Sequence, residues 1–241
     1  MHRLLKPLPN HLLAALPASD QDLLSRSLVD VDLERGRVLY EPGDRMDTLY
    51  FPHDGVISLM TLMENGAAIE SATIGREGAL GLTTAAAPRQ ALSRAVAQTP
   101  CRCARIGAAR FREAWERSPT IRLMVERHTE ALYAHAIQSV ACNALHSVEA
   151  RFSRWLLTCH DRISSNTVAL TQEFLADMLG VQRTTVTAVA RSLQARGYIR
   201  YRRGVVDILD RAGLESLACE CYMTVRETYE RLLPAPLANS A

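Results

Sequence analysis

A short basic stretch carries the residues whose types best suit contact with a nucleic acid. From Arg183 to Ala195 the apolar residues are spaced by three, four and three, which predicts a helix with one buried face. The opposite face consists of Arg183, Thr184, Thr187, Ala188 and Arg191, with Gln182 just before it and Thr185 beside it. Arginine can pair with guanine through two hydrogen bonds, glutamine with adenine, and threonine offers a hydroxyl and a methyl group. This face is therefore a candidate for reading base edges.

The residues before this face predict a partner helix and a tight turn. Thr171 can cap a helix whose first turn holds Gln172 and Glu173, and an acidic side chain suits that end of the helix dipole. Gly180 supplies a left-handed stop, and the second helix follows within three residues. Two helices joined in this way predict a helix-turn-helix, with Thr171 and Gln172 also close to the DNA.

A β-hairpin is predicted directly after the second helix. Residues 198–201 and 205–209 alternate like strands, and Arg202-Arg203-Gly204 lies where a hairpin turn belongs. Arg200, Arg202 and Arg203 would then lie on or beside the tip of a wing and contact phosphates. A helical hairpin used only for packing would also explain the apolar spacing, but it does not explain the order, the tight turn and the basic tip together.

The charge of the chain is uneven, although its net charge is only +2. From Arg151 to Arg211 there are ten arginines and five acidic residues, a local charge of +5, which leaves −3 for the rest. A basic domain joined to a mildly acidic one suits DNA at one end and a different task at the other.

These residues resemble the DNA-binding domain of the Crp/Fnr family of bacterial transcription regulators. The matching motifs are Leu170-Thr171-Gln172-Glu173, Ala176-Asp177-Met178-Leu179-Gly180, Arg183-Thr184-Thr185-Val186, Leu193 to Ile199 and Ile208-Leu209-Asp210-Arg211. The resemblance implies a homodimer on palindromic double-stranded DNA, with RNA polymerase as a further partner and a small-molecule effector of unknown identity. In the family the second helix usually begins Arg-Glu, with another Arg five residues after the first. Here Thr184 replaces the Glu and Ala188 replaces the second Arg, which predicts fewer fixed G·C positions.

The first half of the chain predicts an antiparallel β-roll. Short apolar strands are expected at 38–40, 48–51, 56–60, 68–72 and 95–97, with Gly36, Gly43, Gly55, Gly66 and Gly75 at turns that need positive φ. Gly36-x-Val38-Leu39-Tyr40-x-x-Gly43-Asp44, followed by Leu49-Tyr50-Phe51 and Gly55, resembles the entry to the cyclic-nucleotide-binding roll of the same family. The fold class is therefore α+β, with a jelly-roll-like sensor, a long dimerisation helix and a winged helix-turn-helix.

The effector pocket implied by this resemblance lacks its usual partners. In family members that bind a cyclic nucleotide, a Gly-Glu pair takes the ribose, and an Arg about ten residues later holds the phosphate. Gly78-Ala79 matches the pair with Ala in place of Glu, while Glu77 lies two places early. Arg89 follows Ala79 by ten residues, whereas the alternative register puts Ala91 at the clamp and Arg94 three places late. No register restores both partners, which argues against a cyclic nucleotide and leaves another ligand or none.

The remaining candidate chemistries are weak. The cysteine pairs 101/103 and 219/221 lack the Cys-x2-Cys spacing of common zinc sites, so no metal is predicted, and only a redox role stays open. The family's iron–sulfur members use N-terminal cysteines, and the first hundred residues here contain none. His53 is the sole histidine between Leu12 and Arg127, which excludes the metal site of a cupin enzyme. No catalytic residues are predicted.

A long helix from Pro119 to about Asn143 is predicted to make the dimer. Its seam has near-heptad spacing and comprises Ile121, Val125, His128, Leu132, His135, Ala136 and Ser139. The two histidines could act as a protonation switch, but polar residues that set the register of a coiled coil explain them more simply.

The predicted organisation has four parts. Residues 1–118 form the sensor with N-terminal helices, 119–147 the dimerisation helix and hinge, 148–233 the DNA-binding domain with one continuous C-terminal helix, and 234–241 a disordered tail. No apolar run is long enough to cross a membrane, and the start lacks the apolar stretch of a signal peptide, so a cytoplasmic location is expected. The alternative function is a cyclic-nucleotide-responsive regulatory subunit or scaffold whose helix-turn-helix binds protein.

Overall fold

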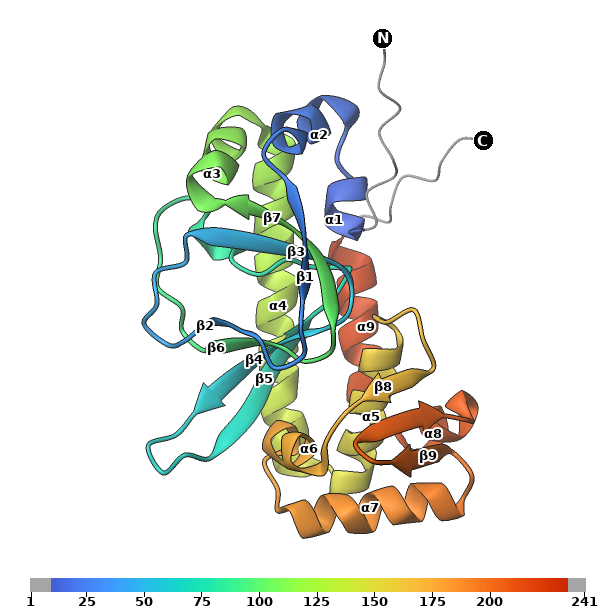
Figure 1. Ribbon diagram of the computed structural model, residues 1–241. Helices are drawn as coiled ribbons and strands as arrows, with labels where there is room; N and C mark the ends of the chain where they lie inside the picture. The colour runs from blue at the N-terminus through green and yellow to red at the C-terminus, as the bar shows by residue number, and fades with distance from the viewer. Residues whose placement is uncertain (1–9, 234–241) are drawn as a thin grey trace, which may run out of the picture.

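The computed structural model describes residues 10–233 and places a β-roll beside a long helix that leads to a second, mostly helical domain (Figure 1). The α+β fold class is confirmed: an antiparallel N-terminal roll, a long helix and a C-terminal helix-turn-helix. The expectation of a disordered tail at 234–241 lies outside the described residues.

The roll consists of two antiparallel sheets. One is three-stranded in the order β1-β7-β3, and the other is four-stranded in the order β2-β6-β4-β5. The strands are β1 (Val29–Leu33), β2 (Val38–Tyr40), β3 (Thr48–Asp54), β4 (Ile57–Leu62), β5 (Ala68–Ile74), β6 (Arg94–Ala97) and β7 (Cys101–Gly107). A short 3-10 turn, η1 (Leu82–Thr84), follows β5.

Buried and exposed side chains along β7 show why this sequence forms a sheet with one face in the core. Cys101 and Cys103 are buried in the core of the roll, whereas Arg102 and Arg105 between and beyond them are exposed. The five expected strands are present, whereas β1, which carries acidic residues at alternate positions, and β7 were not among the predicted strands. Positive φ is found at Gly36, Gly43, Gly55 and Gly66, but not at Gly75.

Helices cover one end of the roll and continue into the long helix. They are α1 (His11–Ala14), α2 (Ala18–Ser25), α3 (Ala108–Arg117) and α4 (Pro119–Leu145). Ser118 starts α4, because its hydroxyl accepts from the amide of Ile121 at 3.1 Å while Pro119 needs no acceptor for its nitrogen. The helix continues two residues beyond Asn143, and only His146 and Ser147 lie between α4 and α5.

The second domain contains the helix-turn-helix and a three-stranded sheet in the order β8-β10-β9. Its elements are α5 (Val148–His160), β8 (Thr167–Ala169), α6 (Gln172–Leu179), α7 (Arg183–Ala195), β9 (Ile199–Arg202), β10 (Val205–Ile208), α8 (Arg211–Leu217) and α9 (Cys221–Leu232). The prediction of one continuous C-terminal helix is wrong: Ala218 is extended, with ψ near 143°, and separates α8 from α9. The break lets α9 turn back and pack along α4 (Figure 1).

The second domain is docked on the roll of its own chain. Trp155 of α5 is 1% exposed and donates from its indole nitrogen to the carboxyl of Glu70 on β5 at 3.1 Å. Val56, just before β4, and Met60 within it belong to the same core cluster as the buried residues of α5 to α7. A methyl group at Gly180 would lie 2.9 Å from the side chain of Ile69, so the turn of the helix-turn-helix sits directly against β5.

Within residues 10–233, the structure contains no helix with the length and apolar character needed to cross a membrane.

Candidate nucleic-acid interface and effector sites

The helix-turn-helix is built by caps that the sequence encodes locally. The Thr171 hydroxyl accepts from the amide of Phe174 at 3.3 Å and begins α6, and Gly180 ends it with φ 61°. Helix α7 then begins at Arg183 and buries Val186, Ala190 and Leu193 against the domain core. These apolar anchors leave the basic face of α7 exposed. The helix lies along the edge of the molecule farthest from the roll (Figure 1).

Most of the predicted base-reading residues lie on this open face. Exposed are Gln182, Arg183, Thr184, Ala188 and Arg191, and half-buried are Thr171, Gln172, Thr185 and Thr187. Arg183 is held by Glu173 at 2.8 Å, and the Thr187 hydroxyl donates to the Gln172 side chain at 2.9 Å. An exposed ion pair of this kind contributes about 0–1 kcal/mol, so Arg183 is readily exchanged to another partner.

The wing closes the other side of a groove beside α7. Arg203 and Gly204 have φ of 48° and 75°, the left-handed pair that a tight two-residue hairpin turn requires. The exposed Arg202 and Arg203 lie at this turn, while Arg200 pairs with Asp207 at 2.9 Å. Between wing and helices lies a groove of about 420 Å³, lined among others by Gln172, Arg183, Arg191 and Arg203. A convex basic helix, a basic tip and a groove between them suit a duplex backbone.

The segment predicted as an effector pocket is filled from within the chain. The amide of Ala79 donates to Nε2 of His128 on α4 at 3.2 Å, and Ala79 is 1% exposed. A methyl group at Gly78 would lie 2.8 Å from the same imidazole nitrogen, so only glycine fits there. Burial lowers the pKa of His128 to about 4, and the neutral ring accepts this hydrogen bond.

The two candidate phosphate clamps do not converge on Gly78 and Ala79. Arg89 is exposed, and Arg94 pairs with Glu41 of the roll at 2.9 Å. Among the described residues, no hydrogen bond or ion pair joins Arg89 or Arg94 to Glu77, Gly78 or Ala79.

Glu77 takes part in a different structure, the junction between the two domains. Its carboxylate bonds the guanidinium of Arg162 at 2.7 and 2.8 Å, and that arginine also donates to the Thr73 hydroxyl at 2.7 Å. Burial would raise the pKa of Glu77, but the Arg162 charge outweighs it and the pKa is lowered. A methyl group at Gly75 would clash with the Arg162 side chain, which explains this glycine without a positive φ.

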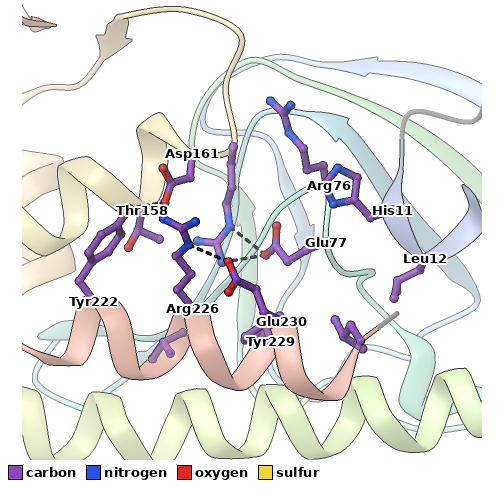
Figure 2. A pocket seen from close by; sticks show the side chains of 13 residues that line it. His11, Leu12, Arg76, Glu77, Thr158, Asp161, Tyr222, Arg226, Tyr229 and Glu230 are labelled. Carbon is purple, nitrogen blue, oxygen red and sulfur yellow. Dashed lines mark hydrogen bonds and ion pairs between the residues drawn. The ribbon is translucent and has the colours of Figure 1, made fainter. Parts of the chain in front are cut away.

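A cavity of about 500 Å³ opens beside this ion pair (Figure 2). The roll and α1 contribute His11, Arg76 and Glu77, and the DNA-binding domain contributes Asp161, Arg162, Tyr222 and Arg226 from α9 and the end of α5. Charges of both signs line it, so it can accept a polar ligand that touches both domains. No sequence pattern pointed to this cavity, because its walls come from four separate segments.

The predicted dimer seam on α4 mostly faces inward. Ile121, His128, His135 and Ser139 are buried against the roll and α9, while Val125, Leu132 and Ala136 are half-buried. His135 stacks edge-on against Tyr229 of α9, and burial keeps its pKa well below the usual value. The four buried residues of the seam therefore pack within the chain, and the three half-buried ones keep part of their surface open.

A different stripe of α4 is apolar and open. Tyr133, Ile137 and Val140 are each more than half exposed and follow one another at spacings of four and three, one face of a helix. In the sequence this stripe was hidden by the longer inward-facing pattern.

A cluster of sulfur and nitrogen atoms lies where α4 ends. Cys142, His146, Cys219 and Cys221 place one ligand atom each within 4.8 Å of one another. The sequence pattern marked Cys219 and Cys221 only as a pair, and the two residues at the end of α4 complete the group.

Two family models match this chain. The model of the Crp-like helix-turn-helix domain matches residues 150–217, and that of the cyclic nucleotide-binding domain matches residues 30–118. No curated protein sequence matches significantly.

Solved structures share the fold over most of the chain. FixK2 from Bradyrhizobium japonicum is 16% identical, with a TM-score of 0.67 and coverage of 80% of this chain and 98% of that one. A CRP/FNR-family transcriptional regulator from Thermus thermophilus is 24% identical, with a TM-score of 0.64 and coverage of 79% and 98%. The c-di-GMP-responsive global regulator CLP from Xanthomonas campestris is 19% identical, with a TM-score of 0.58 and coverage of 80% and 99%.

The fold and the two matched domains define a transcription regulator rather than an enzyme. The chain belongs to the Crp/Fnr family, as the sequence motifs predicted. Its sensor is a cyclic nucleotide-binding-like domain.

Acid should destabilise the protein through His128. An unfolded histidine has a pKa near 6.5, against about 4 in the native protein. Below pH 6.5 the unfolded chain binds a proton that the native chain does not, so stability present at pH 7 is lost as the pH falls. Between pH 7 and pH 5 this group should remove roughly 2 kcal/mol of unfolding free energy. Urea denaturation at the two pH values measures the loss.

His128→Gln keeps an acceptor for the Ala79 amide but does not titrate. Between pH 7 and pH 5 the unfolding free energy of this variant should fall by roughly 2 kcal/mol less than that of the native chain, whatever its stability at pH 7. His160→Gln, at the end of α5, is the matched control and should lose as much as the native chain. Equal losses in all three proteins would contradict the assigned role of His128.

Proposed function

We propose that this regulator binds a palindromic operator in double-stranded DNA as a homodimer, under the control of a ligand at the domain junction. The observation that carries the proposal is the open basic face of α7 beside an arginine-tipped wing, on a domain with a surplus of positive charge. A face of this kind supplies both phosphate contacts and base contacts.

Arg183 is the residue that we expect to read a base. It lies at the first turn of α7, its side chain is 64% exposed, and it matches the position of the family's base-reading Arg. Thr184 and Ala188 offer a hydroxyl and methyl contacts, which favour thymine methyls over G·C pairs. Half-sites should lie about 10–10.5 bp apart, centre to centre, and contain fewer fixed G·C positions than the family's usual site.

The stripe Tyr133, Ile137 and Val140 supports the homodimer. Exposed apolar side chains at helical spacing pack well against the same stripe of a second copy, related by a two-fold axis. One helix-turn-helix reaches only one half-site, so a dimer raises the effective affinity for a palindrome.

The junction cavity of Figure 2 is the better place for an effector than the roll's Gly78-Ala79 segment. A ligand can shift an equilibrium only if it contacts two states differently, and this cavity exists only while the two domains are docked. The Ala79 amide, by contrast, is already bonded to His128, and Arg94 is paired with Glu41. RNA polymerase remains a proposed partner of the DNA-bound dimer.

Cyclic nucleotides should therefore not bind. Calorimetry with cAMP and cGMP should show no saturable heat at ligand concentrations up to about 1 mM, the range where binding is worth only ~4 kcal/mol. Micromolar binding that Arg89→Ala or Arg94→Ala removes would place the effector in the roll after all and identify the clamp.

Two variants should distinguish a residue that reads a base from a residue that contacts a phosphate. Operators selected from random duplexes provide the specific DNA, and fluorescence anisotropy at several salt concentrations gives the affinities. Arg183→Ala should reduce the difference in binding free energy between specific and random DNA by about 1–3 kcal/mol, because it removes a guanine contact. Arg203→Ala should weaken both DNAs alike and reduce the slope of log K against log salt by about 0.9.

Arg196→Ala is the control, because this exposed arginine at the far end of α7 pairs with Glu149 at 3.4 Å. It should change neither quantity. If Arg183→Ala weakens random and selected DNA equally, Arg183 is a phosphate contact. If no duplex binds with a salt-dependent affinity, the helix-turn-helix serves a protein partner, which is the alternative function.

Ile137→Asp should convert the dimer into monomers, because it places a charge in the middle of an apolar interface. Size-exclusion chromatography with light scattering measures the mass directly. Leu209→Asp is the matched control, an equally exposed apolar residue at the end of the wing, and should leave the dimer intact. An unchanged mass for Ile137→Asp would show that another surface makes the dimer.

A further inference from the structure

Three cysteines and a histidine from two distant segments converge at the end of α4. Cys142 lies in the last turn of α4, His146 is its C-cap residue, and Cys219 and Cys221 flank the start of α9. The sulfur atoms of Cys142 and Cys219 are 3.5 Å apart, and the sulfur of Cys221 is 3.4 Å from Nδ1 of His146. We propose that these four residues form a Cys₃His site for a single Zn²⁺ ion.

The spacing fits one tetrahedral ion. With Zn–S bonds of about 2.3 Å and a Zn–N bond of about 2.0–2.1 Å, tetrahedral ligands lie about 3.6–3.8 Å from one another. Two of the observed separations, 3.4 and 3.5 Å, need a small expansion, and all four ligand atoms lie within 4.8 Å of one another. Thiolate and imidazole ligands in a tetrahedron favour zinc over magnesium or calcium, which prefer oxygen.

The groups around the cluster are those that a zinc site requires. The Glu220 carboxylate lies 3.1 Å from Nε2 of His146, so it can hold the proton on that nitrogen and leave Nδ1 free for the metal. The Gln138 amide donates to the sulfur of Cys221 at 3.0 Å, as a donor to a thiolate would. Glu220 is exposed and His146 partly so, which gives the ion a path from solvent.

Positive charge lies close to the cluster. Three thiolates and one Zn²⁺ carry a net charge of −1, and the buried guanidinium groups of Arg151 and Arg154 lie close enough to offset it. The Nε atoms of both arginines are buried and have no hydrogen-bond partner among the described residues.

The position gives the ion a structural task. It would tie the turn between α8 and α9 to the point where α4 gives way to α5 across His146 and Ser147. The three thiols release protons to solvent on binding, and no oxidation or reduction is involved. The ion would thus restrict movement at the hinge between the roll and the DNA-binding domain.

The test uses the full chain, purified with a reductant and stripped with a chelator. Elemental analysis after zinc is added back and excess removed should give one zinc per chain. Titration with Co²⁺ should produce the visible bands of tetrahedral cobalt and a sulfur-to-cobalt charge-transfer band. Cys221→Ser should weaken zinc binding at least 100-fold, and Glu220→Gln should weaken it about 10- to 100-fold, as loss of a carboxylate on a metal-bound histidine does.

Cys159→Ser and Cys103→Ser are matched controls, because both thiols are buried elsewhere, and both should keep one zinc per chain. The cobalt spectrum of the native chain tests the site even if a variant fails to fold. Absence of tetrahedral cobalt bands in the reduced native chain would overturn the proposal. So would zinc binding that Cys221→Ser leaves unchanged, or a Cys142–Cys219 disulfide that forms in the reductant-treated chain and excludes the metal.

Discussion

The arrangement of the two domains depends on the buried ion pair between Glu77 and Arg162. Arg162 is buried and the Glu77 side chain is 20% exposed, and loss of one partner from such a pair costs up to about 3–5 kcal/mol, because the remaining charge is left without its partner. Only glycine fits at position 75, because a side chain there would clash with Arg162. The Thr73 hydroxyl accepts a further hydrogen bond from the Arg162 guanidinium. Together with the Trp155–Glu70 hydrogen bond, this contact makes the docked arrangement a defined state rather than one of many. A regulator needs such a state, since an effector can act only on an equilibrium between distinct arrangements.

His128 occupies the segment that resembles the nucleotide-binding segment of the family. Family members that bind the nucleotide present backbone amides at this segment, and here the Ala79 amide is satisfied by an imidazole from α4. The buried Ala79 amide therefore has a hydrogen-bond partner, although the family's Glu and Arg do not occupy the matching positions. The roll can thus serve as a rigid platform for α4 and the DNA-binding domain.

Local signals in the sequence predicted most of the fold, whereas contacts between distant segments could not be predicted. Thr171, Gly180 and the Arg203-Gly204 turn act through their nearest neighbours in the sequence. The helix caps, the turn and the wing could therefore each be predicted from a few consecutive residues. The seam on α4 illustrates this limit, because periodicity shows that a face is buried but not what covers it. Its buried histidines face the roll and α9 of the same chain, and the shorter open stripe around Ile137 carries less signal. The break at Ala218 was missed for a related reason, since apolar spacing continues through it.

The cysteine cluster is the contact between distant segments that the sequence predicted least. Cys219 and Cys221 have a spacing that no common zinc motif uses, and Cys142 and His146 lie more than seventy residues away. Only the return of α9 along α4 brings the four together, and that return follows from the break that the sequence concealed. The cluster and the Glu77–Arg162 pair lie at different points of the contact between the domains, one near the hinge and one beside the junction cavity. A chain held at both points can change its domain arrangement only by breaking one of them, and the ion pair, which borders an open cavity, is the one that a ligand can reach.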